Sequence, residues 1–348
     1  MSLSATSTSR NGTERPARKK RIGVIGSLVW DVIHGRDTRV APVEEWGGIT
    51  YALSALDAAL ADDWEIVPIM MVGEDLAARA REFLGTLRRL APDASLMAVP
   101  YPAQRVELRY QSEERRTERL TGGMPAWSWL ALKPLLDEAK LDALLINFLS
   151  GWELDLETTT LIRQHFAGPI HCDLHMMAWA VQPDGLRTLR PIPNVAEWCR
   201  CFDFLQMNED ELAMVAPDPM SLAATAIAAG VSCLFVTLGK RGAIYVAAPG
   251  FDAIGDLPRR AGLSTAPRGG TGGLGAVRTA LVAAESVDDS LDPTGCGDVW
   301  GATYFSRMLA GDKLADAMKA AGVAAARNVG HRGTTGLASH LRGELSLT

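Results

Sequence analysis

A glycine-rich turn followed by an aspartate begins a predicted helix near the end of the chain. The sequence reads DPTGCGDVW from Asp292 to Trp300. Gly295 and Gly297 permit a tight turn, and the apolar run after Asp298 predicts a helix. Unpaired backbone N–H groups at such a helix start attract an anion. A carboxylate beside them suits a general base next to a phosphoryl group, although an ordinary helix cap would also explain it.

The segment HCDLH contains three residue types that bind metals. If it is a β-strand, His171, Asp173 and His175 share one face, because alternate residues of a strand do. Such a set could hold zinc or iron. A strand end in an α/β sheet is also commonly polar, so both interpretations stay open.

Two glycine-rich segments could contact phosphate. GGTGGLGA matches a dinucleotide-binding pattern at Gly270, Gly272 and Gly275. That pattern requires a preceding strand, whereas the residues before it indicate a loop, so a surface loop is the preferred interpretation. TLGKRG joins two apolar runs and is typical of a glycine hairpin.

An acidic cluster, NEDE at residues 208–211, follows another apolar run. Its oxygen donors could reach a hydrated Mg²⁺ at the end of a strand. Acidic residues also favour the first turn of a helix, which is the simpler explanation of the cluster taken alone.

Composition excludes several classes of protein. The chain has 348 residues, is 47% hydrophobic and carries a net charge of -6, which does not suggest nucleic-acid binding. Its apolar runs are interrupted before they reach membrane-spanning length, so no membrane association is expected. The five cysteines are odd in number and lack a CxxC pair, which favours free thiols in a cytoplasmic protein.

Short apolar runs alternate with helical stretches from residue 21 onward. This rhythm predicts a mostly parallel sheet covered on both faces. Residues 105–120 instead alternate with period two around a polar turn, which predicts a hairpin and a candidate lid. Residues 1–20 are polar and end in a basic cluster, so we expect a flexible tail.

Six motifs occur in the order typical of the ribokinase/PfkB-like carbohydrate kinases, and residues 21–340 resemble that family. They are VIGSLVWD, WGG, VGED, NEDE, TLGKRG and DPTGCGD. The resemblance implies an α/β fold: a three-layer α/β/α sandwich with a mostly parallel central sheet and a small β lid. The kinase domain would comprise residues 21–348, with lid segments at about 32–46 and 99–123.

The resemblance also assigns catalytic and substrate-binding roles. Asp298 matches the general base of a phosphotransferase that uses ATP and Mg²⁺ to phosphorylate a sugar hydroxyl. The matching anion-hole residues are Gly295, Cys296 and Gly297. The positions that match substrate-hydroxyl contacts are Asp31, Gly47 and Gly48.

The donor side of the site is implied in the same way. Asn208 and Glu211 match residues that organise Mg²⁺ through water, and Asn208 also matches a nucleotide contact. Asp292 lies where several members bind a monovalent cation such as K⁺. The nucleotide loop is matched by Thr237, Gly239 and Gly242.

The expected partner is a small sugar-like molecule, and the chain would act as a monomer or homodimer. Two alternatives remain open at this point. A nucleoside kinase of the same fold would need an apolar or aromatic cleft for the base, which Trp46 and Tyr51 could help to build. A non-catalytic sugar- or nucleotide-binding regulator is the other alternative, and the intact Asp298 argues against it.

The predicted hairpin is rich in arginine, which is suited to carboxylate or phosphate groups. Arg105 begins the hairpin closest to the protein body and is therefore our candidate for contact with an anionic substrate. Glutamates in the same hairpin largely balance these charges, so a solvated hairpin is the preferred explanation.

We predict that Cys296→Ala retains activity, because the anion hole requires the backbone and not this side chain. A thiol at a helix start is more readily ionised, although the nearby Asp298 opposes this. Iodoacetamide should therefore inactivate the wild type slowly, and more slowly still with MgATP. A time course of activity on both proteins checks this, and equal inactivation of the two would implicate another thiol.

Overall fold

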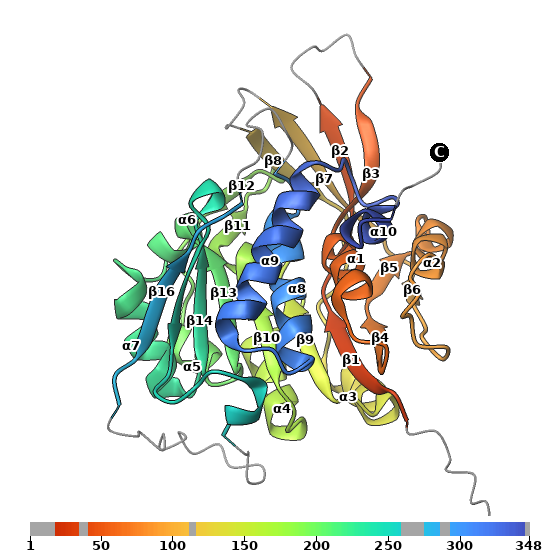
Figure 1. Ribbon diagram of the computed structural model, residues 1–348. Helices are drawn as coiled ribbons and strands as arrows, with labels where there is room; N and C mark the ends of the chain where they lie inside the picture. The colour runs from red at the N-terminus through yellow and green to blue at the C-terminus, as the bar shows by residue number, and fades with distance from the viewer. Residues whose placement is uncertain (1–17, 35–40, 111–115, 259–274, 286–292, 345–348) are drawn as a thin grey trace, which may run out of the picture.

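The computed structural model describes residues 18–34, 41–110, 116–258, 275–285 and 293–344, and an eight-stranded sheet forms its centre (Figure 1). The strand order is β16-β15-β14-β13-β10-β9-β1-β4. The pairs from β14 to β4 are parallel, whereas β15 is antiparallel to both of its neighbours. The strands are β1 (Lys20–Ile25), β4 (Trp64–Ile69), β9 (Ala143–Asn147), β10 (Ile170–Asp173), β13 (Phe204–Asn208), β14 (Cys233–Thr237), β15 (Ala243–Ala247) and β16 (Arg278–Val282).

Helices cover both faces of this sheet. Successive strand residues point to opposite faces, so they belong to two different hydrophobic clusters. Val24 belongs to the first cluster and Ile25 to the second. The first cluster takes in α1 (Ile49–Ala59), α2 (Ala77–Gly85), α8 (Cys296–Leu309), α9 (Leu314–Val329) and α10 (Leu337–Leu341). The second takes in α3 (Trp129–Ala139), α4 (Leu156–His165), α5 (Val195–Cys199), α6 (Glu209–Ala213) and α7 (Pro219–Ala229). The predicted three-layer sandwich is confirmed. Within the described residues, every helix is too short or too polar to cross a bilayer.

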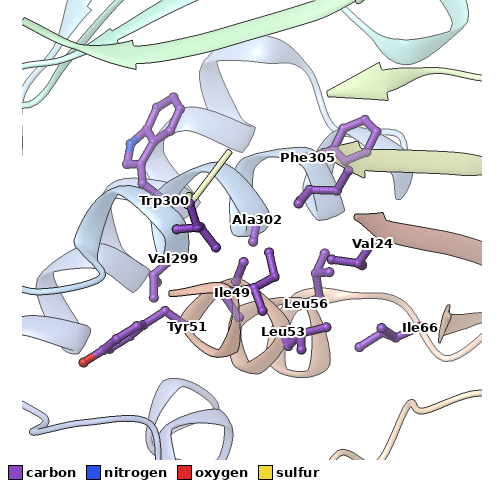
Figure 2. Close-up of a cluster of buried hydrophobic side chains, with 14 of the residues drawn as sticks. Val24, Ile49, Tyr51, Leu53, Leu56, Ile66, Val299, Trp300, Ala302 and Phe305 are labelled. Carbon is purple, nitrogen blue, oxygen red and sulfur yellow. The ribbon is translucent and has the colours of Figure 1, made fainter. Parts of the chain in front are cut away.

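Helices α1 and α8 pack directly against each other, although they come from opposite ends of the chain (Figure 2). Ile49 and Leu53 of α1 face Val299 and Ala302 of α8 in this cluster. The contact is closest at Gly295, the N-cap of α8, where an added Cβ would overlap the Tyr51 ring. This packing fixes the start of α8 relative to the start of α1.

A second sheet of four strands forms the lid at the top of Figure 1, in the order β3-β2-β7-β8. The predicted hairpin is present as the β7–β8 pair. Alternation gives the lid two different faces. Val106, Leu108 and Glu118 line a cavity, whereas Trp30 and Trp46 meet edge to face on the other side, 5.0 Å apart. The lid strands are β2 (Leu28–His34), β3 (Val43–Gly48), β7 (Gln104–Tyr110) and β8 (Arg116–Thr121).

A hairpin that the sequence analysis did not anticipate joins the lid to the body. The Leu120 N–H of β8 donates to the Gly185 carbonyl at 2.9 Å, and Arg119 pairs with Asp184 at 2.8 Å. The hairpin therefore extends the lid beyond β8. Its strands are β11 (Trp179–Val181) and β12 (Arg187–Leu189). The remaining short elements are β5 (Met71–Gly73), β6 (Met97–Val99), and the 3₁₀ turns η1 (His175–Ala178), η2 (Gly239–Arg241) and η3 (Ile254–Asp256).

We predict that Tyr304→Phe stabilises the fold. Tyr304 of α8 is fully buried, with its ring 4.3 Å from that of Phe235, and its hydroxyl has no hydrogen-bond partner among the described residues. An unsatisfied buried hydroxyl costs about 1–3 kcal/mol, so its removal should raise the free energy of unfolding by about 1 kcal/mol. Urea denaturation measures this change. Tyr245→Phe, in β15, is the control: its hydroxyl is not among the buried groups that lack a partner, so its removal should not raise the free energy of unfolding.

Candidate active site

The turn before α8 has the geometry of an anion site. Gly295 adopts a φ of 74° as the N-cap, and α8 begins at Cys296. A Cβ added to Gly297 would meet no atom within 4 Å, so the space beside this residue is open. The first backbone N–H groups of the helix have no intrahelical acceptors and carry the positive end of its dipole. The turn can therefore receive a phosphoryl group.

Asp298 lies in the first turn of α8 and lines the adjoining cavity. Asn147, at the end of β9, donates its Nδ2–H to Asp298 Oδ1 at 2.5 Å. Burial raises the pKa of Asp298 above its ordinary value, while the positive charge of His175 and the Asn147 hydrogen bond act in the opposite direction. A carboxylate with a raised pKa is a better proton acceptor, which is what a general base requires.

A buried glutamine connects the anion turn to the central sheet. Gln206 Nε2 donates to Asp173 Oδ2 at 2.8 Å and to the Gly297 carbonyl at 3.0 Å. A Cβ on Gly301 would overlap the Gln206 amide, so the glycine allows α8 to approach β13 this closely. Burial raises the pKa of Asp173. The start of α8 is thus held by polar contacts as well as by apolar packing.

The acidic cluster after β13 forms a capping box, and a histidine from η1 contacts it. Glu211 Oε2 accepts from the Asn208 N–H at 2.9 Å, and the Glu211 N–H donates to Asn208 Oδ1 at 2.9 Å. Glu211 Oε1 accepts from Asn208 Nδ2 at 2.7 Å and lies 2.8 Å from His175 Nδ1. Burial alone would lower the pKa of His175, but the charge and hydrogen bond of Glu211 outweigh it and raise that pKa to about 10. His175 therefore carries a positive charge beside two carboxylates.

A cavity of about 80 Å³ lies between the lid and the start of α8. Its polar walls bring together side chains from β2, β8, η1, β12, α8 and the turn before α8. Its other walls come from the lid, α1, η1 and the segment after β9. The polar residues are Asp31, Glu118, His175, Arg187, Thr294 and Asp298. The other lining residues are Val29, Gly48, Tyr51, Val106, Leu108, Leu149, Met176 and Gly295.

The predicted acceptor residues come together at one end of this cavity. A Cβ on Gly47 would overlap the Asp31 carboxylate, which therefore lies directly over the Gly47 backbone. Gly48 has a φ of 58° and a ψ of -127°, a conformation that favours glycine, and α1 begins at the next residue. Asp31 and Asp298 line the same cavity, as the family resemblance implies for a substrate site.

The predicted donor residues lie beyond the ends of neighbouring strands. Thr237 of β14 is paired in register with Asn208 of β13. Gly239 has a φ of 56° and open space beside it, whereas Gly242, with a φ of 98°, packs closely against the Val282 carbonyl. Gly239 can approach a ligand, while Gly242 shapes the turn.

The structure places Arg105 away from the cavity. It is the second residue of β7 and lies on the outer face of the lid, because the inward positions on this strand belong to Val106 and Leu108. Its Nη2 pairs with Asp75 Oδ2 at 2.7 Å. The expected contact between Arg105 and a substrate anion is therefore not supported by this geometry.

The HCDLH segment does not present three ligands on one strand face. Strand β10 ends at Asp173, and His175 lies in η1 with a φ of 23°. The His171 ring is buried and stacks on Phe305 at 5.4 Å; burial lowers its pKa to about 3. The described residues contain no cluster of three metal-binding side chains of the His, Cys, Asp or Glu type.

The Cys296 thiol faces α9. Its Sγ donates to the Ala325 carbonyl at 3.5 Å and accepts from Asn328 Nδ2 at 3.3 Å. The backbone of Cys296, which begins α8, thus belongs to the anion turn while the side chain packs against another helix. Asp292, Gly270 and Gly272 lie outside the described residues.

Three site residues were missed by the sequence analysis. Asn147 and Gln206 lie within apolar runs that were taken only as strands, and an isolated buried amide in such a run was the available signal. Arg187 lies in a segment to which we had assigned no element. Nothing local distinguishes it from the exposed arginines around it.

We predict that Asn147→Ala moves the acidic limb of the pH–rate profile to higher pH. The Asn147 hydrogen bond lowers the pKa of Asp298, so its loss should raise that pKa further, and a base must be unprotonated to act. The measurement is kcat/KM for phosphate transfer against pH, with nucleotide affinity as the control for folding. An unchanged limb would show that Asp298 is not the titrating group.

Comparisons with known proteins concern the family and the fold of the chain. Residues 184–340 match the model of the pfkB family carbohydrate kinases. No curated protein sequence matches the chain.

Similar solved structures cover nearly the whole chain. A Burkholderia thailandensis nucleoside kinase in complex with inosine is 16% identical, with a TM-score of 0.63 over 91% of this chain and 94% of that one. A Thermotoga maritima ribokinase is 16% identical, with a TM-score of 0.61 over 93% and 98%. A pyrophosphate-dependent kinase in the ribokinase family, complexed with a pyrophosphate analog and myo-inositol, is 13% identical, with a TM-score of 0.65 over 90% and 96%. Residues 184–340 are thus similar to the pfkB family carbohydrate kinases, and the described residues of the chain have the fold of the ribokinases.

Proposed function

We propose that the protein transfers the γ-phosphate of ATP to a hydroxyl of a sugar or sugar derivative, with Asp298 as the general base. The observation that carries this proposal is that Asp298 belongs to two parts of the site at once. The residue belongs to the helix start that can receive a phosphoryl group, and its side chain lines the cavity that contains Asp31. One carboxylate therefore adjoins both the donor side and the acceptor side.

The mechanism follows from these positions. Asp31 and the Gly47–Gly48 backbone hold the acceptor, whose reacting hydroxyl lies against Asp298. Asp298 accepts the hydroxyl proton while the oxygen attacks the γ-phosphorus in line, and ADP leaves with the bridging oxygen. The N–H groups of the Gly295–Gly297 turn stabilise the negative charge on the transferred group. Asn147 holds one carboxylate oxygen of Asp298, which orients the base.

Asn208 and Glu211 are the residues that would organise Mg²⁺. Both Glu211 oxygens already accept hydrogen bonds from Asn208, so the carboxylate fits an ion that keeps its water shell better than one bound directly. When bound, Mg²⁺ would neutralise charge on the ATP phosphates. Glu211 is buried and bonded to His175, which fixes the orientation of its carboxylate.

The cavity favours a small acceptor over a nucleoside. Its volume of about 80 Å³ is well below the roughly 300–1,000 Å³ of pockets that enclose drug-sized ligands. Tyr51 lines it, but Trp46 packs on Trp30 on the other face of the lid and cannot stack on a base there. The intact Asp298 argues against a non-catalytic regulator.

We predict that Asp298→Asn lowers kcat by about 10²–10⁴-fold, the usual contribution of a general base. The Asn147 hydrogen bond can be retained, and removing a buried carboxylate should not reduce thermal stability. The assay is ADP formation with MgATP and a panel of sugars, polyols, sugar acids and nucleosides. Nucleotide affinity should be unchanged.

A variant with near-normal turnover would remove Asp298 from the mechanism. A wild-type protein that transfers phosphate to no hydroxyl compound in the panel would contradict the proposed function itself.

A further inference from the structure

A buried arginine lines the acceptor cavity, and the mechanism above does not use it. The Arg187 side chain is 3% exposed. Its Nη2 donates to the Leu149 carbonyl at 2.8 Å, and its Nη1 lies 3.4 Å from Glu118 Oε2, which is a long hydrogen bond. Its Nε–H is buried and has no partner within the described ranges. A guanidinium carries five N–H donors, so most of its donor capacity is unused by these contacts.

The position of Arg187 depends on the joint between lid and body. It begins β12, in the hairpin that pairs with β8, and it spans from the Leu149 carbonyl to Glu118 of the lid. A charge buried without full compensation is costly, and burial lowers the pKa of Arg187. A residue needed only to hold the joint would not require a guanidinium facing the cavity, because the exposed Arg119–Asp184 pair already links the same elements.

The charges around the cavity indicate which ligand Arg187 can accept. Three carboxylates line it, those of Asp31, Glu118 and Asp298, together with the guanidinium of Arg187. The carboxylates outnumber the guanidinium, so the wall favours a ligand that carries no negative charge of its own. Glu153 is also close to Arg187, but its carboxylate accepts bonds from Ser27 and from the backbone of residues 149–151.

We propose that Arg187 is the acceptor-recognition residue and that the acceptor is a small uncharged polyol, such as a free sugar or cyclitol. One oxygen of the polyol accepts an N–H from Arg187, and a neighbouring hydroxyl donates to Glu118 or Asp31. Adjacent hydroxyls can serve both an N–H donor and a carboxylate at once. A sugar acid or sugar phosphate could satisfy Arg187 but would be repelled by the carboxylates. This inference rests on the proposed function for the location of the acceptor.

The test measures binding and transfer separately on the full-length chain. Isothermal titration would use ribose, fructose, glucose and myo-inositol, then glucuronate and glucose 6-phosphate. The wild type should bind at least one neutral polyol more tightly than either anion. Arg187→Met should raise the Kd for that polyol by about 10- to 100-fold, the range for hydrogen bonds to charged groups. Arg190→Met is the matched control, since Arg190 is exposed three residues further along, and it should leave this Kd unchanged.

Glu118→Gln provides a second test, in which Arg187 is retained. Removing one negative charge should increase the affinity for glucuronate relative to the neutral polyol. ADP affinity should stay at the wild-type value in each variant, which establishes that the fold is retained. If Arg187→Met fails to fold, the ratio of the Kd for glucuronate to the Kd for the polyol in Glu118→Gln, compared with the wild type, decides whether the cavity selects an uncharged acceptor.

Three results would overturn the inference: preferred binding of an anion, no binding of any neutral polyol, or unchanged polyol affinity in Arg187→Met. An unchanged ratio in Glu118→Gln would also count against it. Polyol binding that weakens in Arg187→Met, with no phosphate transfer by the wild type, would contradict the proposed function but support the role of Arg187. Transfer with undiminished polyol binding in Arg187→Met would contradict this inference alone.

Discussion

The contact between Gly295 and the Tyr51 ring determines how the two halves of the site face each other. No side chain fits at Gly295, because a Cβ there would overlap the ring, and the positive φ of this residue is required by the turn itself. Tyr51 lies two residues after the start of α1, which directly follows Gly47 and Gly48. One packing contact therefore sets the separation between the acceptor turn and the anion turn.

Polar groups buried around Asp298 also hold the start of α8 in place, and burying them costs free energy of folding. Burial raises the pKa values of Asp173 and Asp298, and the nearby carboxylate of Glu211 acts in the same direction on both. His175 supplies the opposing positive charge, while Gln206 and Asn147 donate to two of these carboxylates. Such a cluster is less stable than an apolar one would be, as is common where a protein holds a reactive group.

Much of the fold could be predicted from the sequence, because hydrophobic periodicity is a local signal. The strands around Leu144 and Leu234 and the helix that follows Asp298 were all anticipated, and the family motifs indicated Asp31 and Glu211. Arg105 was assigned to the site because it begins the hairpin near the body, but the pleat of β7 turns it outward. Its correct assignment required knowing which strand face is covered.

The polar residues that position Asp298 could not be predicted in this way. Asn147 and Gln206 are brought to Asp298 and to the anion turn by sheet order and by α8, neither of which is encoded near them. Arg187 enters the cavity only because its hairpin pairs with β8 of the lid. These are tertiary contacts between segments far apart in the chain, so a pattern read over a short window cannot contain them.

The pairing of α1 with α8 has a consequence for synthesis of the protein. Helix α1 emerges early, yet the surface that covers Ile49 and Leu53 belongs to a helix made near the end of translation. Its apolar face therefore stays uncovered in the nascent chain until almost all other elements have been synthesised. Contacts of such long sequence separation slow folding and prolong exposure of apolar surface. Chains that terminate before α8 would lack both Asp298, the proposed base, and the cover for α1, and they would be substrates for chaperones or proteases.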